Sequence, residues 1–494
     1  MGKRIMLALF RYVFSGIALG YFAYVVSSLP FKYYISIIAG VFLATPAAYA
    51  YLIISSQTKT RLMCLFVSLF IFGIPFNLDY NFFYRDYVGV TSVDISLSLI
   101  SLIILFAFLV YDARFNAVKA YSFFIDRKIF YAFLFFVTMG CLSTIGADHH
   151  DLALLELARL CILLFLVFVI MNLQDRTYID VLLVSLSVTI VLEALIALYQ
   201  FKTGHTIGLQ VFGEKEIILQ DIGFVAKRAT GTIGDPNIFG YFFEMLIPLM
   251  FAMFISERRL LIKCWYFFAA VIGCAGIYTT LSRGAWLTLP ISTVIVFLIM
   301  FRGRFLRLST IIWLWLATMI ISIILTFSFP VVYKRFTHDD YGSAETRAPL
   351  NQAALSVVRQ FPLLGVGLNN MAKVFKKYDK TGHTRMFVGK DHVVHNMYLQ
   401  IWTEVGTVGL FAFLLMLASA LFTSLSLLFK VSYWDRGLLA GVTAGILAQG
   451  IHALLDPGFK TMMNMSMLFY TYIGLIGAVS ILYRLERPPD SWSK

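Results

Sequence analysis

The chain has 494 residues, of which 60% are hydrophobic and only 14% are charged, and its mean hydropathy is +0.82. A soluble domain carries roughly 25% charged residues, so this much apolar surface cannot be hidden in one water-soluble core and must be solvated largely by lipid. The composition therefore excludes an ordinary soluble protein and predicts an integral membrane protein.

Fourteen segments have the length and apolar content of a spanning helix, which needs about 20 mainly apolar residues. In chain order they are 5–28, 33–55, 62–78, 95–111, 129–147, 152–172, 180–201, 238–256, 260–281, 285–301, 309–330, 407–429, 437–455 and 462–483. These segments predict an all-α, polytopic membrane protein of about 14 transmembrane helices, with residues 1–494 forming a single transmembrane domain.

The distribution of Lys and Arg predicts the orientation, because these residues accumulate in cytoplasmic loops. Alternate loops and both termini hold clusters of them: Lys3/Arg4, Lys59/Arg61, Arg114/Lys119/Arg127/Lys128, Arg176, Arg258/Arg259/Lys263, Arg302/Arg304/Arg307, Lys430/Arg436 and Arg484/Arg487/Lys494. The short loops between them hold only Lys32, Arg85, Arg283 and Lys460. We therefore expect both termini to be cytoplasmic. The formal net charge of +13 is then mostly topological, and it implies no nucleic-acid partner.

Two connections are long, about 202–237 and about 331–406, and both are predicted on the outer, periplasmic side. Long loops are usually functional. In the second, Leu350, Ala354 and Val358 lie at the spacing of one buried helical face, and Pro362 is expected to end that short helix. Arg347 shares the same face. Two interpretations stay open: the arginine points inward at the bundle, or the helix is interfacial and the arginine reaches lipid headgroups.

Both outer loops are basic. Between Lys334 and Asp391 the second carries ten Lys or Arg against five acidic residues, and the first also holds several basic residues. A basic cluster favours an anionic ligand, and phosphate oxygens are groups that arginine binds in a bidentate manner. The anion is a lipid headgroup, a diphosphate or an acidic sugar.

Four short segments together resemble a known family. They are Lys227-Arg228-Ala229-Thr230-Gly231-Thr232-Ile233-Gly234-Asp235-Pro236-Asn237, Ser282-Arg283-Gly284-Ala285-Trp286, Phe361-Pro362-Leu363-Leu364-Gly365-Val366-Gly367, and His395-Asn396 followed by Gly406-Thr407-Val408-Gly409-Leu410. Their order and their position around the large outer loop resemble the O-antigen ligase and O-antigen polymerase superfamily, over about residues 220–415.

The resemblance implies a membrane glycosyltransferase of the bacterial inner membrane. Such an enzyme takes a glycan from an undecaprenyl diphosphate carrier on the periplasmic face and passes it to an acceptor hydroxyl. The acceptor is the lipid A core of lipopolysaccharide in a ligase, a second lipid-linked glycan in a polymerase, or a protein Ser or Thr in an O-oligosaccharyltransferase. The resemblance further implies an inverting reaction with no metal and no other cofactor, and a catalytic loop at 331–406.

The resemblance also implies the site residues. His395, Arg347 and Arg283 form the catalytic set, and Arg228 and Asn396 join the two arginines in binding the diphosphate or the glycan. The chemistry agrees with these residue types, because an imidazole can accept the proton of a sugar hydroxyl and guanidinium groups stabilise a departing diphosphate. The alternative for His395 is a helix-capping or interfacial histidine. If His395 only orients the acceptor, a carboxylate such as Glu404 or Asp391 becomes the candidate base.

Other interpretations compete with this one. The rival class is a transporter or a flippase for lipid-linked oligosaccharides, but such proteins usually contain internal repeats, and none is detectable here. His392 and His395 share a helix face without a third ligand at a recognisable spacing, so no metal is expected. Arg159, Glu193 and Glu244 lie within predicted spans, where charge is expensive and often functional. A structural pair between Arg159 and Glu193 and a contact with substrate are both open.

Overall fold

The computed structural model describes residues 56–76, 79–84, 89–115, 122–215, 218–221, 225–302, 333, 347–379, 392–460 and 462–486. Three predicted spans, 5–28, 33–55 and 309–330, lie outside these residues. The helices are α3 (Ser56–Phe72), α4 (Leu97–Phe115), α5 (Arg127–Ile145), α6 (His150–Met171), α7 (Arg176–Thr203), α8 (Pro236–Ser256), α9 (Leu260–Thr279), α10 (Arg283–Met300), α12 (Arg347–Gln360), α13 (Met371–Tyr378), α14 (Met397–Leu427), α15 (Tyr433–His452) and α16 (Met463–Leu485).

Eleven of these helices stand where spans were predicted. Among the described residues, nine are long and apolar enough to cross a membrane, namely α4 to α10, α14 and α16. The 17-residue α3 and α15, whose sequence is interrupted by several glycines, complete the set. The chain is thus a helical protein with many apolar helices, while the full count of fourteen stays a prediction.

Two short antiparallel hairpins lie in the connections of this helical fold. Strand β1 (Asp79–Phe82) pairs with β2 (Val93–Ser96), and β3 (Ile218–Asp221) pairs with β4 (Val225–Arg228). Each strand has four residues. A segment this short shows too little alternation of apolar and polar residues to be recognised in a sequence. The 3₁₀ turn Gln210–Phe212 precedes β3 in the same connection, and a second 3₁₀ turn, Gly458–Lys460, lies between α15 and α16.

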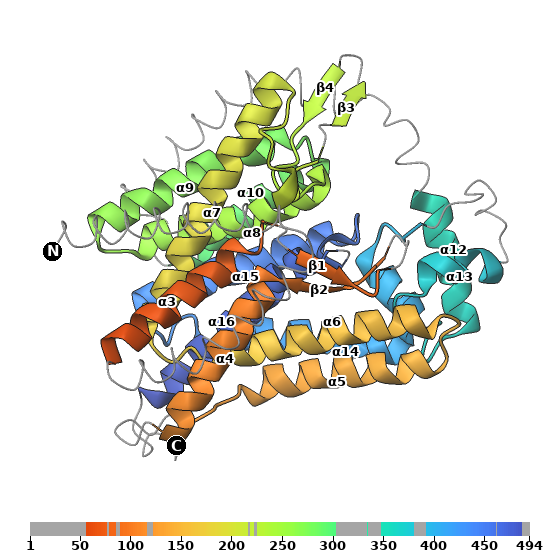
Figure 1. Ribbon diagram of the computed structural model, residues 1–494, viewed down its shortest axis with the longest axis horizontal. Coiled ribbons are helices and arrows are strands. Elements are labelled where there is room, and N and C mark those ends of the chain that lie inside the picture. The colour runs from red at the N-terminus through yellow and green to blue at the C-terminus, as the bar shows by residue number, and fades with distance from the viewer. Residues whose placement is uncertain are drawn as a thin grey trace, which may run out of the picture.

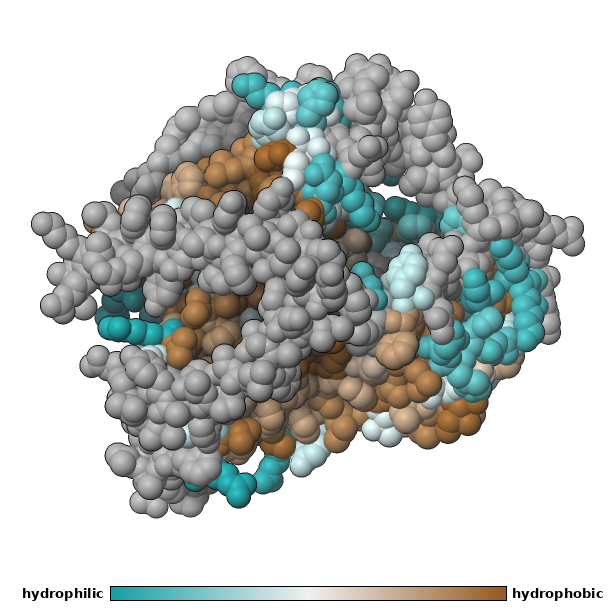
Figure 2. Space-filling model, viewed as in Figure 1, coloured by the Kyte–Doolittle hydropathy of each residue, from teal (hydrophilic) through white to brown (hydrophobic). Residues whose placement is uncertain are grey.

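The core lies where α8, α15 and α16 pass through the centre of the bundle (Figure 1). Helix α8 packs on α9, α10 and α15, and α16 packs on α6 and α14. The apolar stretch of α16 is entirely buried, as expected for a helix with no polar face. Figure 2 shows an apolar surface over the long helices and hydrophilic residues gathered at the end that carries α12 and α13. The described part of the outer loop therefore forms a polar cap on an apolar body.

The cap has its own small core. As the apolar spacing predicted, a helix begins at Arg347 and ends before Pro362, and it buries Leu350, Ala354 and Val357. These side chains pack with α13 and with Val394, the residue that precedes His395. The described part of the second outer loop is thus folded against the start of α14, which positions the predicted histidine.

Candidate active site

His395 lies at the N-terminus of α14. Asn396 caps that helix, because its side-chain oxygen accepts the N–H of Leu399 at 3.0 Å. The next residue, Met397, donates its N–H to the carbonyl of Ala453 at 2.9 Å. This bond ties the start of α14 to the end of α15, so His395 is held beside the connection between α15 and α16.

That connection supplies a carboxylate to the histidine. The Nδ1 atom of His395 lies 3.6 Å from an Oδ atom of Asp456, and the two side chains are 34% and 12% exposed. Asp456 also accepts the backbone N–H of Gly458 at 3.0 Å. Burial raises the pKa of the Asp456 carboxyl, but His395 and this N–H outweigh the effect and hold the pKa below its ordinary value. Asp456 is therefore ionised at neutral pH, with Nδ1 of His395 facing it.

An imidazole held in this way is suited to act as a base. A carboxylate beside Nδ1 favours the tautomer that carries its proton on Nδ1, which leaves Nε2 free to accept one. Asp456 was not predicted as a site residue. Its only local signal is Asp456-Pro457-Gly458, which is typical of a turn, and its distance from His395 along the chain gives no hint that the two side chains meet.

A second histidine pairs with a second carboxylate next to the first pair. His452 Nδ1 lies 2.9 Å from Glu244 Oε2, and both side chains are buried. Tyr241 stacks on the ring of His452, with centroids 4.0 Å apart, and donates its hydroxyl to the carbonyl of Asp456 at 3.1 Å. Thr288 donates to the same carboxylate of Glu244 at 2.6 Å. Glu244, which the sequence left unassigned, thus joins α8, α10 and α15 directly behind Asp456.

The two predicted catalytic arginines stand at the starts of α10 and α12. Arg283 is the first residue of α10, and its neighbour Gly284 lies against His452 so closely that any side chain there would collide with the ring. Arg347, half-buried at the start of α12, acts electrostatically on Tyr241 and His452. The start of α10 therefore contacts the ring of His452, and Arg347 lies within electrostatic range of the same ring.

The other two predicted binding residues have structural bonds. The guanidinium of Arg228 is buried, and it donates to the carbonyl of Thr280 at 2.9 Å and to the side chain of Asn237 at 2.7 Å. It thereby fixes the first family segment against the end of α9, beside Arg283. Asn396 uses its oxygen for the helix cap. Contact of either residue with a substrate stays a prediction.

The third and fourth family segments pack closely against each other through glycines. Gly406 kinks α14 with a φ of 71°, and the chain at Leu363 approaches it so closely that a side chain at 406 would overlap the Leu363 carbonyl. Gly365, with a φ of 69°, lies equally close to the backbone of Glu404. Both positions therefore require glycine. This close packing anchors the connection 331–406 on the first turns of α14.

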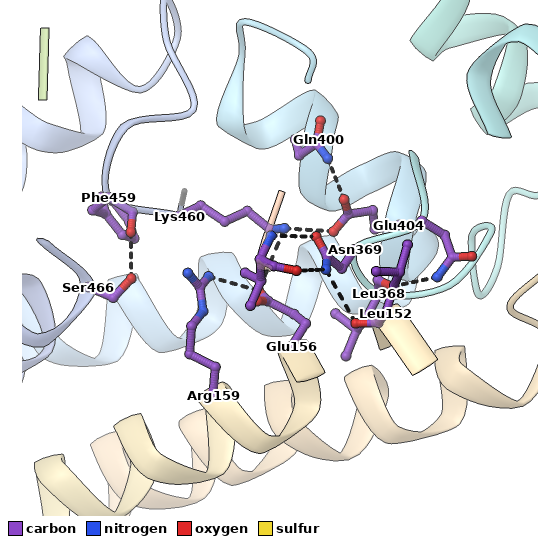
Figure 3. A network of polar contacts seen from close by, with 12 residues as sticks. Leu152, Glu156, Arg159, Leu368, Asn369, Gln400, Glu404, Phe459, Lys460 and Ser466 are labelled. Atoms are coloured by element: carbon purple, nitrogen blue, oxygen red, sulfur yellow. Dashed lines mark hydrogen bonds and ion pairs between the residues drawn. The ribbon is translucent and has the colours of Figure 1, made fainter. Parts of the chain in front are cut away.

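The buried charges on α6 and α7 are paired differently from the expected Arg159–Glu193 contact. Arg159 donates to Glu156 at 2.9 Å on its own helix (Figure 3), whereas Glu193 accepts the backbone N–H of Thr232 at 3.1 Å. The suggested pair was wrong because neighbours on one helix face, three residues apart, meet more directly than residues on separate helices. As for metals, no group of three His, Cys, Asp or Glu side chains in the described part of the chain is arranged to hold an ion, and Asp391 lies outside it.

Part of the chain matches a known protein family. A family model described as O-antigen ligase matches residues 268–414. Over this stretch the chain is similar to the O-antigen ligase family. The match confirms the resemblance seen in the short segments, and it spans Arg283, Arg347, His395 and the kink at Gly406. Asp456, which faces His395, lies outside the matched residues. No curated protein matches the chain.

Proposed function

We propose that this O-antigen ligase-like chain is a membrane glycosyltransferase that moves a glycan from an undecaprenyl diphosphate carrier to an acceptor hydroxyl. The observation that carries the proposal is the pairing of His395 with the ionised Asp456. The adjacent His452 is contacted by the residue next to Arg283 and lies within electrostatic range of Arg347. A base for the acceptor and cations for the leaving group are the two requirements of this reaction.

The chemistry proceeds in one displacement. The acceptor oxygen bonds to the anomeric carbon while the bond from that carbon to the diphosphate oxygen breaks, so the configuration inverts. His395 takes the hydroxyl proton on Nε2, and the negative charge of Asp456 stabilises the imidazolium that forms. General-base assistance of this kind is typically worth about 10²–10⁴-fold in rate. A diphosphate leaves readily, so the reaction needs neither a covalent intermediate nor a metal.

Arg347 and Arg283 are proposed to hold the diphosphate. Its negative charge increases as the bond breaks, and guanidinium groups fixed in a site with little water stabilise that charge strongly. Their planar, forked donors match phosphate oxygens two at a time. Arg228, by contrast, is proposed to keep the neighbouring segment in place, because its bonds go to Thr280 and Asn237.

We further propose that the site faces the periplasm of a bacterial inner membrane and that both termini are cytoplasmic. The alternation of Lys and Arg among the loops supports this orientation, as does the hydrophilic cap formed by α12 and α13 (Figure 2). The lipid-linked donor then reaches the site from the membrane. The acceptor is a glycolipid such as the lipid A core, a second lipid-linked glycan, or a protein hydroxyl.

The test is whether the purified protein, in lipid nanodiscs with a lipid-linked glycan, releases undecaprenyl diphosphate when an acceptor is added. Three acceptors are supplied separately: lipid A core, a second lipid-linked glycan and a Ser/Thr peptide. Release with one of them, together with its glycosylated product, supports the proposal and identifies the acceptor. Movement of the intact lipid-linked glycan across liposomes without any release would support the flippase instead. A His395→Ala variant provides the inactive control.

A further inference from the structure

A buried ion pair lies beside the His395–Asp456 pair without contacting either side chain. Lys460 Nζ lies 2.7 Å from Glu404 Oε2, and the two side chains are 12% and 0% exposed. Glu404 stands on α14 just before the Gly406 kink, and Lys460 ends the 3₁₀ turn Gly458–Lys460. Figure 3 shows Lys460 reaching from that turn between Glu404 and Glu156. The pair therefore joins the two chain segments that carry His395 and Asp456.

On one side the pair is connected to the histidine. Gln400 donates its side-chain N–H to Glu404 and accepts the backbone N–H of Val394 at 3.0 Å. Val394 directly precedes His395 and is fully buried. Glu404 thus fixes the backbone leading into His395 through a single intermediate side chain.

On the other side the pair is connected to the carboxylate. Lys460 shares the 3₁₀ turn with Gly458, whose N–H is donated to Asp456 at 3.0 Å. Phe459, between them, accepts the hydroxyl of Ser466 at the start of α16. Because Lys460 is held by Glu404, the turn that aims Asp456 at His395 is held against the helix that carries His395.

The surrounding charges balance. Lys460 also lies 3.6 Å from Glu156, which pairs with Arg159 at 2.9 Å. Two acids and two cations therefore share one buried site. Removal of one member leaves an uncompensated charge, which a buried site tolerates poorly. The side chain of Glu404 is fully buried and both its oxygens are bonded, so it is not placed to serve as the base.

We propose that Glu404 and Lys460 are positioning residues that set the distance between His395 and Asp456, with Gln400 as the link to the histidine backbone. The inference rests on the proposed function for its kinetic consequence. Its structural consequence, that loss of the pair loosens both segments together, does not depend on which reaction the protein catalyses.

The experiment compares Glu404→Gln and Lys460→Met, singly and together, with wild type in nanodiscs. Partners that orient a functional histidine commonly change activity by about 10- to 100-fold. We expect kcat to fall by about that factor, KM for the lipid-linked donor to stay within about twofold, and the double variant to be no slower than the slower single variant. Lys460→Arg, which keeps the charge, should recover most of the lost kcat.

Two additions keep the test decisive. Gln400→Met keeps both charges of the ion pair and removes the bonds that link Glu404 to Val394 through Gln400, so it should lower kcat even if the charge variants fold poorly. Lys377→Met is the matched control. It removes an ion pair of the same 2.7 Å length, with Asp148, but the lysine is 61% exposed, and it should leave kcat unchanged.

Backbone amide exchange gives a readout that does not need activity. Peptides covering 392–400 and 453–460 should both exchange faster in Glu404→Gln and Lys460→Met, and neither should change in Lys377→Met. Unchanged exchange, or unchanged kcat in an active enzyme, overturns the positioning role. An equal fall in kcat and rise in KM, with loss of folded protein, also overturns it in favour of a general structural role. If wild type releases no undecaprenyl diphosphate but the two segments still loosen together, the proposed function has failed and the positioning role stands.

Discussion

Replacing Asp456 with Asn removes the negative charge that faces His395 and keeps the size of the side chain. In wild type the Nδ1–Oδ distance is 3.6 Å. Two unit charges at this separation interact by about 1 kcal/mol in bulk water and by about 5 kcal/mol at an effective dielectric constant of 20. Because His395 is about one-third exposed, an intermediate value of about 2–3 kcal/mol is appropriate. The imidazolium forms as the acceptor proton transfers, so this interaction stabilises the transition state more than the ground state.

The expected result is a fall in kcat of roughly 30- to 150-fold, since each 1.36 kcal/mol is a factor of ten, with little change in KM for the donor. The assay is initial-rate release of undecaprenyl diphosphate from purified protein at matched amounts. His395→Ala and the double variant His395→Ala/Asp456→Asn should be equally slow, because Asp456 acts only through the histidine. Full activity in Asp456→Asn, or a further loss in the double variant, would refute this reasoning.

The same pair predicts a pH dependence. The pKa of Asp456 lies below its ordinary value of 3.8, so the stability it contributes is fully present above that ordinary value and is lost only as the pH falls through the lower folded value. Thermal unfolding should show this as a difference in Tm between wild type and Asp456→Asn that shrinks when the pH falls below that ordinary value.

Arg347→Lys keeps the charge but loses the planar fork, so it should reduce transfer nearly as much as Arg347→Ala in the same assay; full activity would instead favour an arginine that contacts lipid headgroups. Gly284→Ala places a methyl group against His452, so it should displace the start of α10 and lower both kcat and Tm. Wild-type kcat and Tm in this variant would show that the two segments adjust to the methyl group at little cost. Single cysteines are introduced at the exposed positions Val211 and Arg258 in a variant without its native cysteines. In spheroplasts, a membrane-impermeant thiol reagent should label the cysteine at 211 and not the one at 258. The reverse labelling would show that the proposed orientation is wrong.

The local features of the sequence predicted much of this fold. Long apolar runs marked α4 to α10 and α16, and the spacing of Leu350, Ala354 and Val358 predicted α12 between Arg347 and Pro362. These predictions succeed because hydrophobic length and periodicity act along the chain. The start of α14 was predicted too late, since the polar residues around Glu404 hide a helical segment before the Gly406 kink.

The candidate site was only partly predictable. His395, Arg347 and Arg283 were predicted through short segments whose order resembles a family, and their roles stay predictions. Asp456 and His452 were missed because their roles arise from packing between distant helices, and neither has a distinctive neighbour in the sequence. The partner of Arg159 was mistaken for a different reason, because Glu156, three residues away on the same helix, was overlooked.

The most direct measurement of the central claim is the kcat of His395→Gln at an abundance matched to wild type. Glutamine keeps a side chain that forms hydrogen bonds, but it cannot take up a proton at neutral pH. If His395 is the base, the variant should lose about 10²–10⁴-fold in kcat, as His395→Ala does, while His392→Ala stays close to wild type. Retention of most activity by His395→Gln would contradict the account, because His395 would then orient the acceptor without accepting its proton.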